Sequence, residues 1–324
     1  MKSSVVLKQR EARTLRREGW KKADLHVHTW NSYDVLRVPS MSPKSLLRKA
    51  RRKLDFVSFT DHDNMDAYDE VNGKGLVSGV ELEVLDEKRV GHTVHMNIYG
   101  LDKELFRELK AMAEDEKNIY KIIGKVKKNN LQYVYNHPFW FKDDESFNPH
   151  KMLKLAEKFP VLEYNTTMIK PVNELVLWAA KEKGKGIIAN TDTHIGSMGT
   201  THTLSQGDTF KEFFNNVKRR KSYIVPRDMN KNLMLREIMQ RIDHFFNPEK
   251  DPAKDYRTGI NERLDKTINF FSTTRFRKLP FVDGALRMAF KKAASRSGRF
   301  INKHLESQGR LVEDIKKKLR IEKN

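Results

Sequence analysis

The sequence predicts an α/β protein whose body is a barrel of short strands and whose C-terminal extension is basic and mostly helical. Three observations lead to this prediction. Short apolar runs alternate with helix-like stretches through residues 24–194, polar residues stand at the ends of these runs, and the pattern stops near residue 204. The chain has 324 residues, of which 38% are hydrophobic. That length accommodates one domain of about 200 residues with an appended region.

The net charge of +20 is unevenly distributed along the chain. Residues 1–23 carry eight Lys and Arg against two Asp and Glu, and residues 205–324 carry 29 against 15. Residues 24–204 carry 26 of each kind and hold nine of the eleven histidines. We therefore expect a basic N-terminal arm over residues 1–22, a body over residues 23–204 and a basic helical region over residues 205–324.

Two absences in the sequence restrict the class of protein. The chain contains no cysteine, so disulfides and thiolate metal sites are excluded and any metal must be held by nitrogen and oxygen ligands. No apolar run approaches the roughly 18 residues that a membrane-spanning helix needs, and the first twenty residues lack the apolar stretch of a signal peptide. We expect a soluble, cytoplasmic protein.

Seven short runs in the body have the length and the β-branched or aromatic bias of strands. In chain order they are DLHVH (24–28), FVSFTDHD (56–63), LVSGVEL (76–82), TVHMNIYG (93–100), YVYNHP (133–138), VLEYN (161–165) and IIANTDTH (187–194). Between them, residues 42–54 begin with Ser and Pro and continue with apolar residues at helical spacing, and residues 173–186 end a similar pattern in Gly. Such alternation is typical of an α/β protein with a largely parallel sheet.

The C-terminal region lacks this pattern. Residues 232–246 carry an apolar stripe at helical spacing, residues 247–252 indicate a linker, and residues 270–320 mix Lys and Arg with aromatic and aliphatic residues. Three interpretations stay open: a helical appendage packed on the body, a surface that follows a nucleic-acid backbone, or a basic amphipathic helix on an anionic membrane. The first is the default, because a run of charges is most often a solvated helix face.

Polar residues with metal-binding or acid–base chemistry stand at or near the C-terminal ends of the seven runs. They are His26, His28, Asp61, His62, Glu81, His95, His137, Glu163, Asp192 and His194. In a (β/α) barrel these strand ends converge on one mouth, and residues i and i+2 of a strand face the same way. Imidazole and carboxylate ligands suit Zn²⁺, Mn²⁺ or Fe²⁺, and a shared carboxylate such as Glu81 can bridge two ions.

Each of these signals has an ordinary structural interpretation when taken alone. An H-x-H pair on a strand is often only solvated, residues 60–63 could cap a helix, and an isolated Glu is usually a structural acceptor. These interpretations would have to hold together at all seven strand ends. The conjunction favours a metal site.

The motifs and their order resemble the PHP (polymerase and histidinol phosphatase) family of phosphoesterases over residues 22–204. The matching segments are DLHVHT (24–29), TDHD (60–63), GVE (79–81), VH (94–95), NHP (136–138) and TDTH (191–194). Residues 173–203 also resemble the PHP-associated segment that closes the barrel. The resemblance implies a distorted seven-stranded (β/α) barrel, with residues 23–204 as the PHP domain, and metal-dependent hydrolysis of phosphate esters.

The resemblance also implies which residues hold two or three divalent ions, with Mn²⁺, Zn²⁺ and Fe²⁺ as candidates. One ion would take His26, His28, Glu81 and Asp192; a second would share Glu81 and add His95 and His137; the third would take Asp34, His62 and His194. His92, His150 and His202 are expected to lie outside the ligand set.

A metal-activated water would attack phosphorus in line, and His194, Asp61 or a metal-bound water would protonate the leaving group. Asp61 and Glu163 would orient histidine ligands. Small or polymeric phosphorylated substrates, monoester or diester, fit this pattern, including those of a nuclease or nucleic-acid-end phosphatase that uses the basic flanks. An inactive scaffold or binding protein is the remaining alternative. Every expected ligand position holds a residue able to bind metal, which favours an enzyme.

Overall fold

The computed structural model describes residues 5–142, 145–247, 266, 280–296 and 298–321. Its strands form two five-stranded sheets, in the orders β10–β9–β1–β2–β3 and β4–β5–β6–β7–β8. The strands are β1 (Lys21–Val27), β2 (Phe56–Phe59), β3 (Leu76–Val77), β4 (Gly79–Leu85), β5 (Thr93–Tyr99), β6 (Gln132–Tyr135), β7 (Val161–Asn165), β8 (Gly186–Asn190), β9 (His202–Ser205) and β10 (Ser222–Val225).

All seven predicted runs contain strands, so the α/β class is confirmed. The expectation of a largely parallel sheet is wrong. The pairs β1–β2, β2–β3, β6–β7 and β7–β8 are parallel, whereas β1–β9, β9–β10, β4–β5 and β5–β6 are antiparallel. Both sheets are therefore mixed.

The described strands do not form the single closed barrel of seven strands that was expected. The reason lies at Ser78, where the run 76–82 divides into β3 and β4. β3 pairs with β2, and β4 turns away to pair with β5, so the hydrogen-bonded ladder passes to a second sheet. Only isolated bridges join the two described sheets at their seams, between Val27 and Thr193 and between His62 and Glu81.

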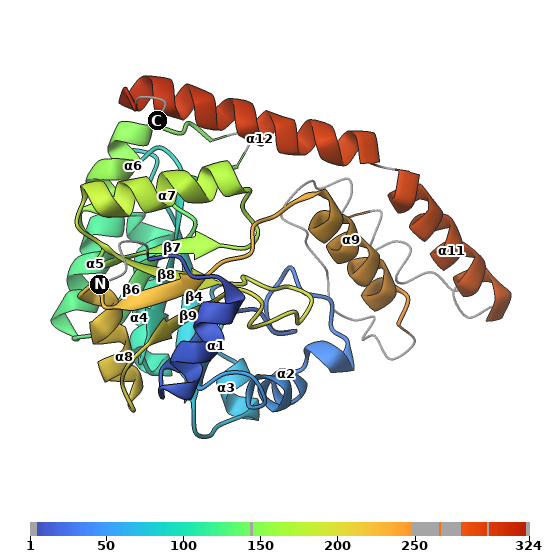
Figure 1. Ribbon diagram of the computed structural model, residues 1–324, viewed down its shortest axis with the longest axis horizontal. Coiled ribbons are helices and arrows are strands. Elements are labelled where there is room, and N and C mark those ends of the chain that lie inside the picture. The colour runs from blue at the N-terminus through green and yellow to red at the C-terminus, as the bar shows by residue number, and fades with distance from the viewer. Residues whose placement is uncertain (1–4, 143–144, 248–265, 267–279, 297, 322–324) are drawn as a thin grey trace.

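Helices surround the sheets (Figure 1). They are α1 (Gln9–Arg17), η1 (Pro39–Met41), α2 (Pro43–Ala50), α3 (Ala67–Glu70), α4 (Lys103–Ala111), η2 (Met112–Glu116), α5 (Ile119–Lys128), α6 (Pro149–Ala156), α7 (Lys170–Glu182), α8 (Phe210–Lys218), α9 (Lys231–Phe245), α11 (Pro280–Arg296) and α12 (Gly298–Leu319). The predicted start of α2 is confirmed, because Pro43 opens the helix and the Ser42 hydroxyl accepts the Ser45 amide at 3.2 Å. The helix ends at Ala50, four residues before the predicted end.

Alternation along the strands separates the core from the functional face. In β4, Val80, Leu82 and Val84 enter an apolar core that helices α4 to α7 cover, while Glu81 points to the opposite face. A second apolar cluster, which includes Leu25 of β1 and Val134 of β6, fills the space between the two sheets. The polar face of the second sheet thus lies above an apolar layer, which holds its side chains in place.

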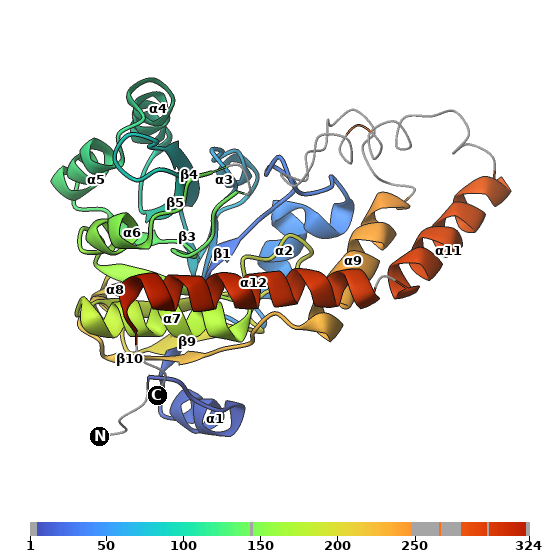
Figure 2. The same ribbon diagram turned by 90° about the horizontal axis from the view of Figure 1, so that it is seen from above.

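The C-terminal region is mostly helical in the residues described, and it also contributes β10 to the first sheet. The apolar stripe predicted over residues 232–246 forms α9, and α12 lies along α7 (Figure 2). Residues 248–252 of the predicted linker and residues 270–279 of the basic and aromatic stretch lie outside the described residues. Among the helices described, none has both the length and the apolar composition to cross a bilayer.

Candidate metal centre

The predicted ligands come from strand ends of both sheets and meet at the seams between them. His26 lies in β1 and His28 follows it, while Asp192 and His194 follow β8. The parallel bridge between Val27 and Thr193 brings these two segments side by side. Residues separated by more than 160 positions therefore face one another because their strand ends are adjacent.

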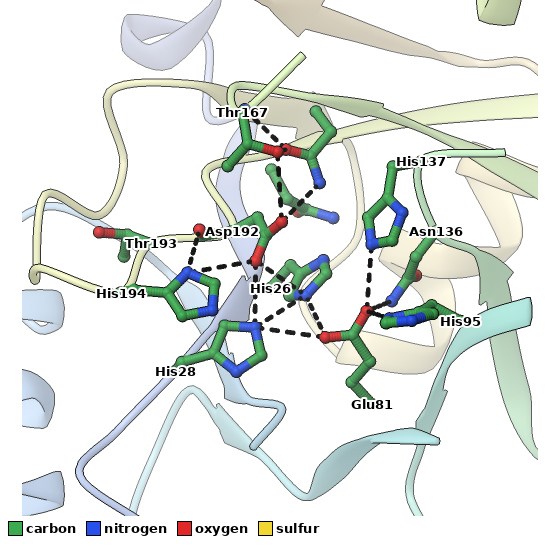
Figure 3. Close-up of polar contacts among 12 residues, drawn as sticks. His26, His28, Glu81, His95, Asn136, His137, Thr167, Asp192, Thr193 and His194 are labelled. Carbon is green, nitrogen blue, oxygen red and sulfur yellow. Dashed lines mark hydrogen bonds and ion pairs between the residues drawn. The ribbon is translucent and has the colours of Figure 1, made fainter. Parts of the chain in front are cut away.

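Four ligand atoms form the densest part of the cluster (Figure 3). His26 Nε2 lies 3.1 Å from His28 Nε2, 2.9 Å from Glu81 Oε2 and 3.3 Å from Asp192 Oδ1. His28 Nε2 lies 3.3 Å from Glu81 Oε2 and 3.0 Å from Asp192 Oδ1. These four residues are the set that the family resemblance implied for one ion.

The spacing of these atoms suits a small divalent cation. Four atoms arranged as a tetrahedron around Zn²⁺ at about 2.0–2.1 Å stand about 3.3–3.4 Å from one another. The five distances given for His26, His28, Glu81 and Asp192 run from 2.9 to 3.3 Å. A shared cation would also stabilise the close approach of His26 Nε2 and His28 Nε2, because without it only one of the two nitrogens can donate a hydrogen bond to the other. The donor set therefore fits a metal ion.

The second oxygen of Glu81 faces a different set of side chains. Glu81 Oε1 lies 3.2 Å from His95 Nδ1 and 3.3 Å from His137 Nε2, and it accepts a hydrogen bond from Asn136 Nδ2 at 2.8 Å. The Nε2 atom of His95 is buried and has no hydrogen-bond partner among the described residues. Because its two oxygens face two groups of nitrogens, Glu81 has the geometry that a carboxylate shared between two ions would need.

The third group surrounds Asp34. Asp34 Oδ2 lies 2.6 Å from His194 Nε2 and 3.6 Å from His62 Nε2. The His28 ring stacks on both histidines, with ring centroids 4.2 Å from His194 and 4.6 Å from His62. The structure thus gathers all nine predicted ligands into one cluster.

The converging donor atoms group slightly differently from the assignment that the resemblance implied. Three sets have ligand atoms within 4.8 Å of one another: His26, His28, Glu81 and Asp192; His28, Asp34, His62 and His194; and His62, Glu81 and His95. His62 thus stands between two sets. His137 belongs to none of the three, although its Nε2 lies near Glu81.

Outer carboxylates and amides hold the histidines in orientation. Glu163 Oε1 lies 2.8 Å from His26 Nδ1, and Asn190 Nδ2 donates to the same oxygen at 2.9 Å. Asn165 Nδ2 donates to Glu163 Oε2 at 2.9 Å and to Asp192 Oδ2 at 3.1 Å. A carboxylate behind an imidazole fixes which ring nitrogen carries the proton, so a neutral His26 would carry its proton on Nδ1, facing Glu163, and direct Nε2 to the centre as a metal ligand.

Asp61 takes a different place from the one expected. Its Oδ1 accepts the Thr29 amide at 2.6 Å and its Oδ2 accepts the Thr29 hydroxyl at 2.7 Å. It is fully buried, and it is absent from the three described sets of converging ligand atoms. These contacts hold the segment after β1, because Thr29 directly follows His28.

Glu83 is a carboxylate at this site that the sequence analysis did not single out. Its Oε1 lies 2.9 Å from His62 Nδ1 and accepts the Tyr33 hydroxyl at 2.7 Å, and its Oε2 lies 4.0 Å from Lys142 Nζ. Glu83 stands two residues after Glu81, so both side chains leave the same face of β4. The E-x-E spacing carried this signal, in the same way as the H-x-H spacing of β1.

Opposite charges balance one another inside the cluster. Burial favours neutral His26, but the charges of Asp192, Glu163 and Glu81 outweigh it and hold the His26 pKa well above its ordinary value. Burial favours protonated Glu81, but the charges of His26 and His62 hold the Glu81 pKa well below its ordinary value. Buried carboxylates whose charge is balanced mainly by the neighbouring imidazoles form a pocket suited to a cation.

Backbone strain coincides with the ligands. Seven described residues other than glycine adopt positive φ values, and three of them stand at the centre: His137 at 26°, Asp192 at 49° and Asp63, next to His62, at 45°. Such conformations cost roughly 1–3 kcal/mol each and persist where the surrounding structure fixes them. Three of the strand ends at the centre are therefore held in unfavourable conformations by their contacts.

No protein-family model and no curated protein matches the chain. Among solved structures, PsfC from Pseudomonas syringae PB-5123 is 15% identical with a TM-score of 0.50, over 69% of this chain and 98% of that protein. At this identity the likeness concerns the fold alone.

Two further neighbours have lower TM-scores. A two-domain protein from Bacteroides vulgatus ATCC 8482, described as containing a predicted PHP-like metal-dependent phosphoesterase, is 16% identical with a TM-score of 0.46, over 68% of this chain and 70% of that one. A Bifidobacterium adolescentis protein, proposed to be a metal-dependent phosphoesterase, is 17% identical with a TM-score of 0.42, over 53% and 87%.

Proposed function

We propose that this chain is a metal-dependent hydrolase of the PHP family that cleaves phosphate esters at a centre of two or three divalent ions. One observation carries the proposal: nine His, Asp and Glu residues lie in one cluster, and the two oxygens of Glu81, one of the nine, face different groups of ligand atoms. The order of the sequence motifs supports the assignment to this family.

Bound divalent ions would neutralise the phosphate charge and activate a water for attack on phosphorus. The residues of the chain would bind these ions and hold the ligand side chains in position around them. Glu163 and Asn165 hold His26 and Asp192 in place, and Glu83 does the same for His62. Of the two residues considered for protonating the leaving group, His194 lies in the cluster while both Asp61 oxygens are engaged by Thr29. His194 is therefore the better candidate of the two, in a state in which it does not itself hold an ion.

The experiment that tests this function combines metal analysis with hydrolysis assays. Purified protein is analysed for Mn, Zn and Fe, and hydrolysis of p-nitrophenyl phosphate and bis-(p-nitrophenyl) phosphate is followed after each ion is added. We expect stoichiometric metal and turnover of at least one ester. Protein without bound metal and without turnover in added Mn²⁺ would leave the inactive scaffold as the better description.

A further inference from the structure

A shallow surface cavity of about 570 Å³ lies between α2 and the segment that follows α3. The two helices lie side by side (Figure 1). Glu70 and Asn72 lie at its opposite wall. Four cations also line the cavity: Lys44, Arg48, Arg51 and Arg52. We call it the α2 cavity. It shares no residue with the metal centre.

The positive charge of the α2 cavity has little compensation. Within the described part of the chain, Lys44, Arg48 and Arg52 form no side-chain hydrogen bond or ion pair. Arg51 donates to the Asn72 carbonyl at 3.2 Å. Glu70 is the only carboxylate among the lining residues. Its Oε1 already accepts the Trp30 indole N–H at 3.0 Å and the Asn31 amide at 3.2 Å.

Helix electrostatics explain only part of this pattern. Cations at the C-terminal end of a helix are favourable, because the helix dipole is negative there, and that accounts for Arg48 in the last turn and for Arg51 at the C-cap. Lys44 stands in the first turn, where the dipole is positive, and this turn has no acidic residue. Residues 42–53 contain six Lys and Arg and no Asp or Glu. A helix surface that served only solubility would carry both positive and negative side chains.

We propose that the α2 cavity binds a ligand that carries two or more phosphate groups. Guanidinium groups match phosphate oxygens with paired hydrogen bonds, and three arginines on one wall can hold adjacent phosphates. The volume lies in the range of small-molecule sites, while the open, cationic wall suits an anion. A free nucleotide and the backbone of a single-stranded nucleic acid share this chemistry.

Trp30 provides a spectroscopic readout of the α2 cavity. Its indole N–H binds Glu70, which lines the cavity, and the Arg37 guanidinium lies 5.0 Å from its ring centroid. An anion bound beside Glu70 changes the electric field at this indole. The inference therefore has a signal that does not depend on catalysis, and it stands apart from the function proposed for the metal centre.

The test compares two double variants of the full chain. Arg48→Gln/Arg52→Gln removes two charges from the α2 cavity, and Lys127→Gln/Lys128→Gln removes two exposed charges from the last residues of α5 as a matched control. The probes are ADP, inorganic pyrophosphate and a fluorescein-labelled oligothymidylate, each added without divalent metal. Binding is followed by tryptophan fluorescence for ADP and pyrophosphate and by anisotropy for the oligothymidylate.

We expect the unchanged chain to bind at least one probe and Arg48→Gln/Arg52→Gln to bind it about ten-fold more weakly or worse, with the α5 control within about two-fold. Preference for ADP and pyrophosphate identifies a free nucleotide; preference for the oligothymidylate, with steep salt dependence, identifies a nucleic-acid backbone. No binding of any probe at millimolar concentration, or equal losses in both variants, overturns the proposal.

Ester hydrolysis in Mn²⁺ should be unchanged in Arg48→Gln/Arg52→Gln, so failure of the metal centre and failure of the α2 cavity give different results.

Discussion

Single carboxylates determine the charge of the proposed metal centre. Glu81 and Asp192 contact the cluster directly, and Glu163 acts on it through His26. All three are buried, so none is screened by water to the extent of a surface charge. Removing one charge should therefore have a larger effect here than elsewhere on the protein.

Asp192→Asn should lower both metal occupancy and turnover by at least about ten-fold, because it removes a charged ligand atom that lies close to His26 and His28. Metal content by elemental analysis and ester hydrolysis by absorbance check this. The control is Asp208→Asn, at a side chain that is 92% exposed and pairs with Lys21. Normal metal content and activity in Asp192→Asn would contradict the ligand assignment.

Glu163→Gln should weaken metal binding by about 10–100-fold while leaving the ligand atoms in place. The carboxylate lies 2.8 Å from His26 Nδ1, and the neutral amide no longer fixes the imidazole proton on that nitrogen. Calorimetric titration with Mn²⁺ measures the affinity, and circular dichroism verifies folding. An unchanged affinity would mean that His26 is oriented by its other contacts.

His202 should make stability depend on pH. Burial first, and the charge of Lys22 second, lower its pKa from 6.5 to about 3. Below pH 6.5, His202 is therefore protonated in the unfolded chain but stays neutral in the folded chain. For this proton, the free energy of unfolding falls by about 1.4 kcal/mol for each unit by which the pH is lowered. Between pH 6.5 and pH 5, the free energy of unfolding measured with urea should fall by about 2 kcal/mol less in His202→Gln than in the unchanged protein. The difference between the two proteins should be constant above pH 7; a constant difference down to pH 5 would contradict the prediction.

Strands position the site because each one carries core residues and functional residues on opposite faces. β5 places Val94, Met96 and Ile98 in the core and directs His95 toward Glu81. β7 does the same with Leu162 and Glu163. A shift of one of these strands moves its ligands together with its core residues, so packing faults far from the centre should reach it.

Gly186→Ala tests this coupling at the first residue of β8. A Cβ atom there would lie 2.4 Å from the Val217 carbonyl oxygen of α8, so strand or helix must shift, at a cost of about 1–3 kcal/mol. We expect lower stability and lower metal occupancy, because β8 leads to Asp192.

The matched control for Gly186→Ala is Gly124→Ala inside α5, where a Cβ atom meets nothing within 4 Å. Alanine favours the helix over glycine by up to about 1 kcal/mol, so this variant should be more stable and bind metal normally. Thermal unfolding and elemental analysis distinguish the two variants. Normal metal occupancy in a destabilised Gly186→Ala would show that β8 can shift without moving Asp192.

The C-terminal region is attached to the body beside the metal centre. Asp228 Oδ1, just before α9, accepts the Tyr164 hydroxyl at 2.5 Å and Asn173 Nδ2 at 2.9 Å. Within α9, Gln240 Nε2 donates to the Ile195 carbonyl at 2.8 Å, next to His194. The charge of Asp192 helps to raise the Glu237 pKa, after burial as the main cause. α9 therefore lies close enough to the centre to influence it.

Asp228→Ala should release the start of α9. It leaves the Tyr164 hydroxyl and the Asn173 amide without their acceptor, which costs about 1–3 kcal/mol. We expect lower stability and faster amide hydrogen exchange in α9. The control is Asp243→Ala, whose partly exposed carboxylate pairs with Arg287 and Lys291 and should contribute less than about 1 kcal/mol. Equal exchange in the two variants would show that Asp228 does not anchor α9.

The sequence by itself determined the seven strands, the α/β class and the candidate ligands, because these depend on local periodicity. Spacing of two residues places His26 and His28 together whatever the rest of the chain does. Tertiary structure decided how the strands pair: the break at Ser78 divides them between two sheets, and local pattern does not specify a pairing partner.

Tertiary structure also decided what each polar atom contacts. Thr29 donates to both oxygens of Asp61, and Glu81 faces two groups of ligand atoms. The side chain of Asn190 accepts the amide of Leu25, which lies 165 positions earlier in the chain, at 2.9 Å. The α2 cavity likewise exists only because α3 folds beside α2. Contacts of this kind depend on the packing of distant segments, so local sequence patterns indicate which residues can bind a metal but not which atoms meet.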